Sequence, residues 1–281
     1  MISQSLRIKS TNLALYICYI IIIAFFIGPV LWVISLSLKT PAEIFTYPPQ
    51  LIPSRLAIKN YVTVWTRSQI SLFMFNSFKI VLFTILGCLC VSVPAAFAFS
   101  RFRFKGKNEA LFGILAFQMI SPIIILIPLY RYMNALNLLD THLGLVMVYI
   151  AVQTPFTVWL LKGFFDSIPQ SLDEAAMVDG CSRIQALLRV ILPISTPGVA
   201  AAVVFIAIQS WAQFIIPFIL ISKPKLLPVS VGIYNFQSTQ AEISTHFLAA
   251  ASILAMLPAI LIFILLQRFI VKFLIAGAVK G

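Results

Sequence analysis

Six long apolar runs constrain the fold of this chain more than any other feature. Each run is close to the roughly 20 residues that a helix needs to cross the hydrocarbon core of a bilayer. Helices of that length satisfy their own backbone hydrogen bonds in lipid, so the sequence predicts an all-α, polytopic membrane protein made of one transmembrane domain, residues 1–281. The predicted spans are residues 13–38, 73–99, 110–130, 145–161, 199–221 and 247–266. With 61% hydrophobic and only 10% charged residues, the composition is not that of a soluble domain.

The distribution of positive charge predicts how the chain crosses the membrane. The net charge of +12 is spread over short loops between apolar runs, so a membrane and not nucleic acid accounts for it. Between the second and third spans, residues 100–107 hold four cations, Arg101, Arg103, Lys105 and Lys107. Short loops rich in Lys and Arg stay in the cytoplasm, which places this segment and both termini inside.

The segment between the fourth and fifth spans, residues 167–197, reads as helix, turn, helix. Asp173 and Glu174 fall early in the first helix, where carboxylates interact well with the helix dipole. Gly180 can adopt the positive φ that ends a helix. Ser182 and Gln185 have the spacing of a capping box, so we expect a second helix from Ser182 that stops before Pro193.

This segment resembles the cytoplasmic EAA loop of permease subunits from binding-protein-dependent ABC importers. The family pattern is Glu-Ala-Ala, three residues, Gly, nine residues and Ile-x-Leu-Pro; here Val190 replaces the usual Ile. The resemblance implies contact with an ATPase subunit through Glu174, Ala175, Ala176, Asp179, Gly180, Leu192 and Pro193. Without a partner, the same pattern would be a structural connector between two spans.

Other stretches narrow the resemblance to the carbohydrate branch of these permeases. They are Asn60-Tyr61, Asn76-Ser77, residues 100–106, residues 127–130, Pro155-Phe156 and the ending, residues 276–281. The resemblance implies an unlike partner permease, two ATP-binding subunits that bind ATP and Mg²⁺, and an extracytoplasmic sugar-binding protein that contacts residues 222–245. One departure is Trp211-Ala212-Gln213-Phe214, where the family often has Trp-Asn-Glu/Asp-Phe.

The residues that an energy-coupling site would need are absent from the sequence, which indicates that the chain does not power transport by itself. No acidic or basic residue lies in the middle of a predicted span, as a proton relay would need, and the sequence contains no P-loop for ATP. No His and carboxylate cluster suggests catalysis or a metal site, so we expect no cofactor in this chain.

A small set of polar and aromatic residues in or near the spans could border a transport path. Neutral amides offer both donors and acceptors to sugar hydroxyls, and an aromatic ring suits the apolar face of a pyranose. The candidates are Asn76, Gln118, Gln153, Gln209, Trp211 and Gln213. The alternative for each is an interhelical hydrogen bond worth about 0.6–2 kcal/mol.

Taken together, these features predict the permease subunit of an ATP-driven importer for an oligosaccharide or related glycoside, in the inner membrane of a prokaryote. A stand-alone facilitator or channel with a structural cytoplasmic loop is the alternative. A membrane-embedded enzyme fits less well, because the residues that catalysis needs do not occur together.

Overall fold

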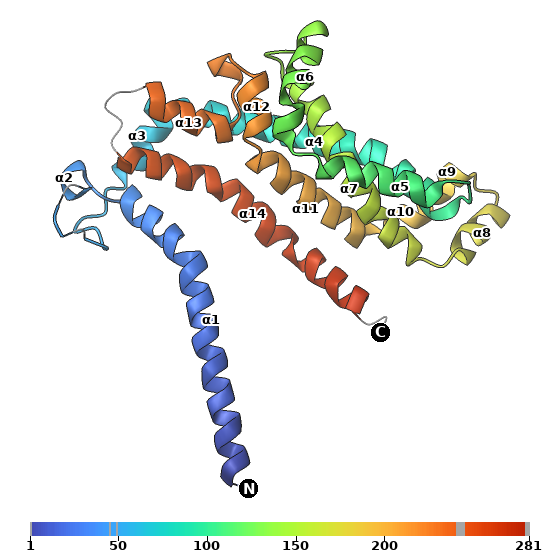
Figure 1. Ribbon diagram of the computed structural model, residues 1–281, viewed down its shortest axis with the longest axis horizontal. Coiled ribbons are helices and arrows are strands. Elements are labelled where there is room, and N and C mark those ends of the chain that lie inside the picture. The colour runs from blue at the N-terminus through green and yellow to red at the C-terminus, as the bar shows by residue number, and fades with distance from the viewer. Residues whose placement is uncertain (1, 45, 49, 240–244, 279–281) are drawn as a thin grey trace. The chain divides into compact units, whose positions relative to one another are not determined.

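The computed structural model describes residues 2–44, 46–48, 50–239 and 245–278. The chain divides into two compact units, residues 1–69 with 235–254 and residues 70–234 with 255–281. Within the described residues all regular structure is helical (Figure 1). The last three residues of the ending that resembles carbohydrate permeases, 279–281, lie outside this description.

The first unit contains α1 (Ile2–Ser37), α2 (Pro41–Ile44) and α3 (Lys59–Arg67), together with the start of α14 (Thr245–Ala278). The Asn60 amide of α3 donates to the carbonyls of Ser37 (2.8 Å) and Lys39 (3.0 Å), and the hydroxyls of Tyr61 and Ser37 lie 2.6 Å apart. The Asn60-Tyr61 pair therefore closes the long loop that follows α1.

Three long helices form the centre of the second unit. These are α4 (Ile70–Arg101), α7 (His142–Asp166) and α11 (Thr196–Ala212), which pack against one another (Figure 1). A core of ten buried residues joins them at one end, and it includes Phe97 of α4, Phe165 of α7 and Ala202 of α11. Leu187 and Ile191, from the segment between α7 and α11, complete that core.

Short elements lie along and at both ends of these helices. The segment between α4 and α7 forms α5 (Lys107–Ala116), the 3-10 turn η1 (Phe117–Met119) and α6 (Pro122–Ala135). Between α7 and α11 lie α8 (Ser171–Val178), α9 (Arg183–Ala186), the π-helical turn η2 (Leu187–Ile191) and α10 (Leu192–Ile194). After α11 come α12 (Ile215–Leu220), the 3-10 turn η3 (Pro224–Leu226) and α13 (Val229–Thr239).

The predicted spans correspond to helices whose bounds differ from the sequence-based ones. Four described helices are long and apolar enough to cross a membrane. The number is up to six if each of two bent pairs counts as one span, Lys107–Met119 with Ile123–Ala135 and Arg183–Ile194 with Thr196–Ala212. The fourth span is longer than predicted, because Thr141 caps α7 at one end and a Lys162–Asp166 ion pair of 2.6 Å supports its last turn.

Two predicted spans are not single straight helices. The run 110–130 bends by 96° where η1 gives way to α6, at the Ser121-Pro122 break. The run 199–221 is interrupted at Gln213 and Phe214, because Gln213 has an extended backbone (ψ 121°) that ends α11.

The second helix of the segment 167–197 also differs from the prediction. The predicted Ser182–Gln185 capping box is present in full. Helical structure, however, does not stop before Pro193 but continues to Ile194. The π-helical turn η2 widens the backbone just before Pro193, which accommodates a ring that would clash in a regular α-helix.

Candidate functional site

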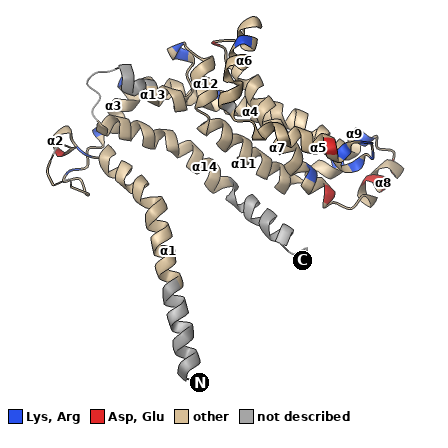
Figure 2. Ribbon diagram, viewed as in Figure 1, with Lys and Arg blue, Asp and Glu red and all other residues tan. Residues whose placement is uncertain are grey.

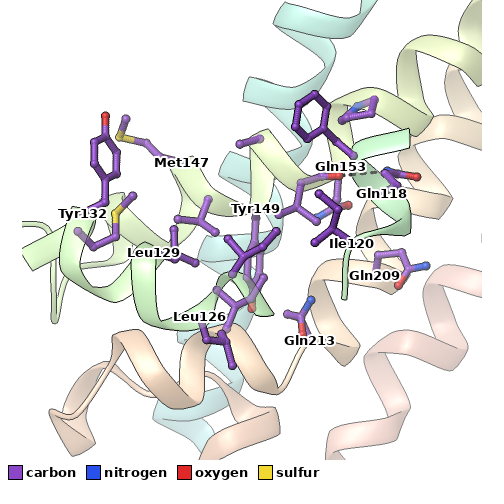
Figure 3. Close-up of a pocket in the computed structure, with 18 of the residues that line it drawn as sticks. Gln118, Ile120, Leu126, Leu129, Tyr132, Met147, Tyr149, Gln153, Gln209 and Gln213 are labelled. Atoms are coloured by element: carbon purple, nitrogen blue, oxygen red, sulfur yellow. Dashed lines mark hydrogen bonds between the residues drawn. The ribbon is translucent and has the colours of Figure 1, made fainter. Parts of the chain in front are cut away.

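One cavity in the second unit has a volume of about 770 Å³ and is lined mainly by α6, α7, α11 and η1. Four of the six predicted path residues lie on its wall: Gln118, Gln153, Gln209 and Gln213. Figure 3 shows these four side chains in the right-hand half of the view, with Leu129, Tyr132 and Met147 in the left-hand half. The lining of the cavity therefore combines four amides with apolar and aromatic side chains.

Gln153 is the amide that is held most firmly. It is buried on α7, and its Nε2 donates to the Ser210 hydroxyl of α11 at 2.9 Å. Its Oε1 is also buried and accepts no hydrogen bond from the part of the chain that the structure describes. A buried acceptor without a partner is costly, and a ligand hydroxyl in the cavity would remove that cost.

The other three amides have more freedom. Gln118 is exposed, and its Nε2 donates to the Val152 carbonyl of α7 at 3.1 Å. Gln209 is exposed on α11. Gln213 is partly buried at the break after α11, where its backbone carbonyl accepts from the Ser230 hydroxyl at 2.7 Å. Its side chain therefore projects from the short non-helical break between α11 and α12.

Sequence reasoning missed the aromatic residues of the cavity. Phe117, Tyr132, Tyr149 and Phe205 also line the cavity. Phe117, Tyr149 and Phe205 lie in runs that read only as apolar spans, and Tyr132 follows the third of these runs. Their spacing in the sequence carries no signal for a shared cavity, because they come from η1, α6, α7 and α11.

Asn76 and Trp211 lie outside the lining of this cavity. The buried Asn76 amide donates to the carbonyls of Lys225 (2.9 Å) and Leu227 (3.1 Å), on either side of the end of η3. The indole Nε1 of buried Trp211 donates to the Ala255 carbonyl of α14 at 3.1 Å. Both side chains therefore have partners within the protein, and their predicted place beside the path stays a prediction.

The second candidate site is α8 with the turn that ends it. Gly180 has φ +87°, its N–H donates to the Met177 carbonyl, and the Cys181 N–H donates to the Ala176 carbonyl. These are the two hydrogen bonds of a Schellman motif, so Gly180 ends α8 as the sequence predicts.

Burial sorts the predicted coupling residues into two groups. Glu174, Ala175, Asp179, Gly180 and Pro193 are exposed, whereas Leu192 is half-buried and Ala176 is buried. Because α8 packs against α9 and η2, Ala176 faces the protein's own interior. Ala176 is therefore not on the outer surface of α8, and its predicted contact with an ATPase subunit stays a prediction.

Comparison with known proteins identifies the family. A family model described as "Binding-protein-dependent transport system inner membrane component" matches residues 89–275, which include the cavity and α8. The sulfoquinovosyl glycerol transport system permease protein SmoH of Agrobacterium fabrum is 33% identical, over 90% of this chain and 88% of its own. The trehalose transport system permease protein SugB of Mycobacterium tuberculosis is 33% identical, over 93% and 95%.

A solved structure supports the fold independently. One chain of a bacterial ABC transporter that imports the acidic polysaccharide alginate superposes with a TM-score of 0.81, at 20% identity, over 92% of this chain and 96% of that chain. The resemblance of the sequence to ABC importer permeases is thus confirmed, and this chain belongs to the inner membrane components of binding-protein-dependent transport systems.

Proposed function

We propose that this permease forms part of the path for an oligosaccharide or related glycoside in an ATP-driven importer. The observation that carries this proposal is the cavity whose lining combines four glutamine amides with aromatic and aliphatic side chains. Amides match sugar hydroxyls and aromatic rings match the apolar faces of pyranoses. Several relatives also carry the names of sugars or glycosides, among them trehalose and sulfoquinovosyl glycerol.

The importer needs further subunits, which we propose are an unlike permease, two ATP-binding subunits and an extracytoplasmic sugar-binding protein. ATP and Mg²⁺ would be bound by the ATP-binding subunits. The exposed Glu174 and Ala175 of α8 are available to such a subunit, and Glu174 can accept charge-assisted hydrogen bonds from a cation on it. Residues 222–245 are the proposed contact for the sugar-binding protein, of which residues 240–244 lie outside the described part of the chain.

Sugar uptake by the reconstituted importer tests whether the cavity residues border the transport path. We expect Gln153→Ala and Gln213→Ala to lower uptake of the transported sugar by about 2–10-fold, as loss of a net 0.5–1.5 kcal/mol per hydrogen bond implies. Trehalose and maltose are the first sugars to assay. Gln69→Ala is the matched control, because Gln69 is exposed outside the cavity.

Normal uptake in both cavity variants would assign these amides to helix packing. Uptake by the permease without ATP or any ATPase would instead support a stand-alone facilitator.

Copurification tests the contact with the ATPase. Glu174→Lys should release the ATPase or uncouple it, because reversing one charge of a partly buried pair costs on the order of 2–5 kcal/mol. Glu109→Lys, which changes another exposed carboxylate, should leave ATPase retention normal. If the Glu174→Lys complex assembles normally and shows normal coupled uptake, α8 is a structural connector and does not dock on the ATPase.

A further inference from the structure

The cation-rich segment 100–107 is a strong feature of the sequence that the proposed path does not use. Figure 2 shows its charges gathered with those of α8 and α9 at one end of the second unit. One of these cations, Arg101, is not a surface charge, because its side chain is only 7% exposed. Asp173 of α8, whose side chain is 11% exposed, is its ion-pair partner.

The Arg101 guanidinium joins three elements of the fold. Arg101 is the last residue of α4, and its Nε pairs with the Asp173 carboxylate of α8. Its Nη1 donates to the Phe165 carbonyl at 3.0 Å, and its Nη2 donates to the Ile168 carbonyl at 3.1 Å. Phe165 lies in the last turn of α7, where carbonyls lack partners inside the helix, and Ile168 follows two residues after the end of α7.

Residues beside Arg101 reinforce the same junction. The Ser100 hydroxyl donates to the Asp166 carboxylate of α7 at 2.7 Å. On the other side, the Arg183 guanidinium of α9 lies 4.9 Å from the centre of the Phe102 ring. Residues 100–102 therefore contact the end of α7 and both helices of the segment 167–197.

We propose that Arg101 is a positioning residue that holds α8 to the ends of α4 and α7, so that a displacement of α8 moves both long helices together. The role in transport rests on the proposed function, in which an ATPase displaces α8. Only arginine has the planar fork of donors that can pair with a carboxylate and bond two carbonyls at once. Without this guanidinium, α8 would keep its packing on α9 and η2 but lose its ion pair to α4.

Hydrogen exchange on the purified, assembled complex tests the structural half of the proposal. Arg101→Gln and Asp173→Asn should speed amide exchange in α8 on the order of tenfold or more, because each leaves a buried charge without its partner. Arg101→Lys should give an intermediate rate, since it keeps a charge for Asp173 and loses the fork. Arg103→Gln and Glu109→Gln, which alter exposed charges nearby, should match the wild type. Unchanged α8 exchange in Asp173→Asn, which preserves side-chain volume, would overturn the proposal.

The ratio of sugar imported to ATP hydrolysed tests whether a displacement of α8 is transmitted to α4 and α7. In Asp173→Asn complexes that retain their ATPase, this ratio should fall severalfold while ATP hydrolysis continues. A normal ratio alongside fast α8 exchange would overturn the transmitting role. If the wild type itself shows no ATP-driven sugar uptake, the proposed function fails, and the exchange comparison still decides whether Arg101 positions α8.

Discussion

At the scale of single residues, neighbours in the sequence have opposite surroundings. Successive residues of a helix point about 100° apart, since a turn takes 3.6 residues. Asp173 therefore points inward to Arg101, whereas Glu174 is exposed, and Ala176 is buried, whereas Ala175 is exposed. The Glu-Ala-Ala pattern thus contains residues with different tasks, two available to a partner and one that packs within the chain.

A substitution pair at Gly180 tests the turn that ends α8. Gly180→Val should destabilise the turn by about 1–3 kcal/mol, because a β-branched residue is strained at the observed φ of +87°. A Cβ added at Gly180 would meet no atom within 4 Å, so the strain comes from the backbone alone. Gly180→Asn should therefore remain close to wild type in thermal unfolding and in coupled uptake. If Gly180→Asn and Gly180→Val changed thermal unfolding and coupled uptake equally, the backbone conformation would not be the reason for glycine at this position.

At the scale of elements, η3 and its flanks are held by side chains from two other helices and the turn before α7. The Asp140 carboxylate accepts from the backbone N–H groups of Ser222 (2.5 Å) and Lys223 (3.0 Å). His142 Nε2 donates to the Leu226 carbonyl at 2.9 Å, and Asn76 of α4 donates to the carbonyls on either side. These hydrogen bonds therefore hold residues 222–227 in one conformation.

Removing the Asn76 amide should loosen this loop. Asn76→Ala leaves the Lys225 and Leu227 carbonyls without these donors, at a cost of about 1–3 kcal/mol. We expect faster hydrogen exchange at Leu226, Leu227 and Val229, with α8 unaffected. Asn134→Ala, on the exposed surface of α6, is the control. Unchanged exchange would mean that Asp140 and His142 suffice.

The hydrogen bonds that Glu43 accepts in the loop after α1 should depend on pH. Backbone N–H groups of Thr40 (2.9 Å) and Ser54 (3.0 Å) donate to its carboxylate, and the Thr40 bond is the main reason that the pKa of Glu43 is lowered from 4.5. These bonds contribute fully above pH 4.5 and are lost as the pH falls through the lowered pKa. Amide chemical shifts of Thr40 and Ser54 should titrate with a midpoint below 4.5 and be insensitive in Glu43→Gln. A midpoint at or above 4.5 would contradict this.

At the scale of the whole molecule, the positive charges predict the orientation in the membrane. Single cysteines at Ser54 and Lys105, in a background without the exposed native cysteines, should react with impermeant reagents from opposite sides. Lys105 is preferable to the adjacent Gly106, whose φ of +79° would strain a cysteine. Labelling of both positions from one side would refute six spans with both termini in the cytoplasm.

The sequence by itself determined the features that depend on local properties. The length of the apolar runs predicted the helical membrane fold, and local hydrogen-bonding patterns predicted the capping box at Ser182 and the end of α8 at Gly180. The motif from Glu174 to Pro193 predicted the family. Such properties require no knowledge of distant residues, since caps and turns involve neighbours a few positions apart.

Only the tertiary structure decided which polar residues share a site and which brace the fold. Gln153 meets Ser210, Arg101 meets Asp173 and Asn76 meets Lys225, and each pair is separated by more than fifty residues in the sequence. In an apolar run, any glutamine or asparagine could turn toward a cavity, a backbone carbonyl or another helix. The packing of α4, α7 and α11 decides among these, because a buried polar group goes where a partner lies within hydrogen-bonding distance.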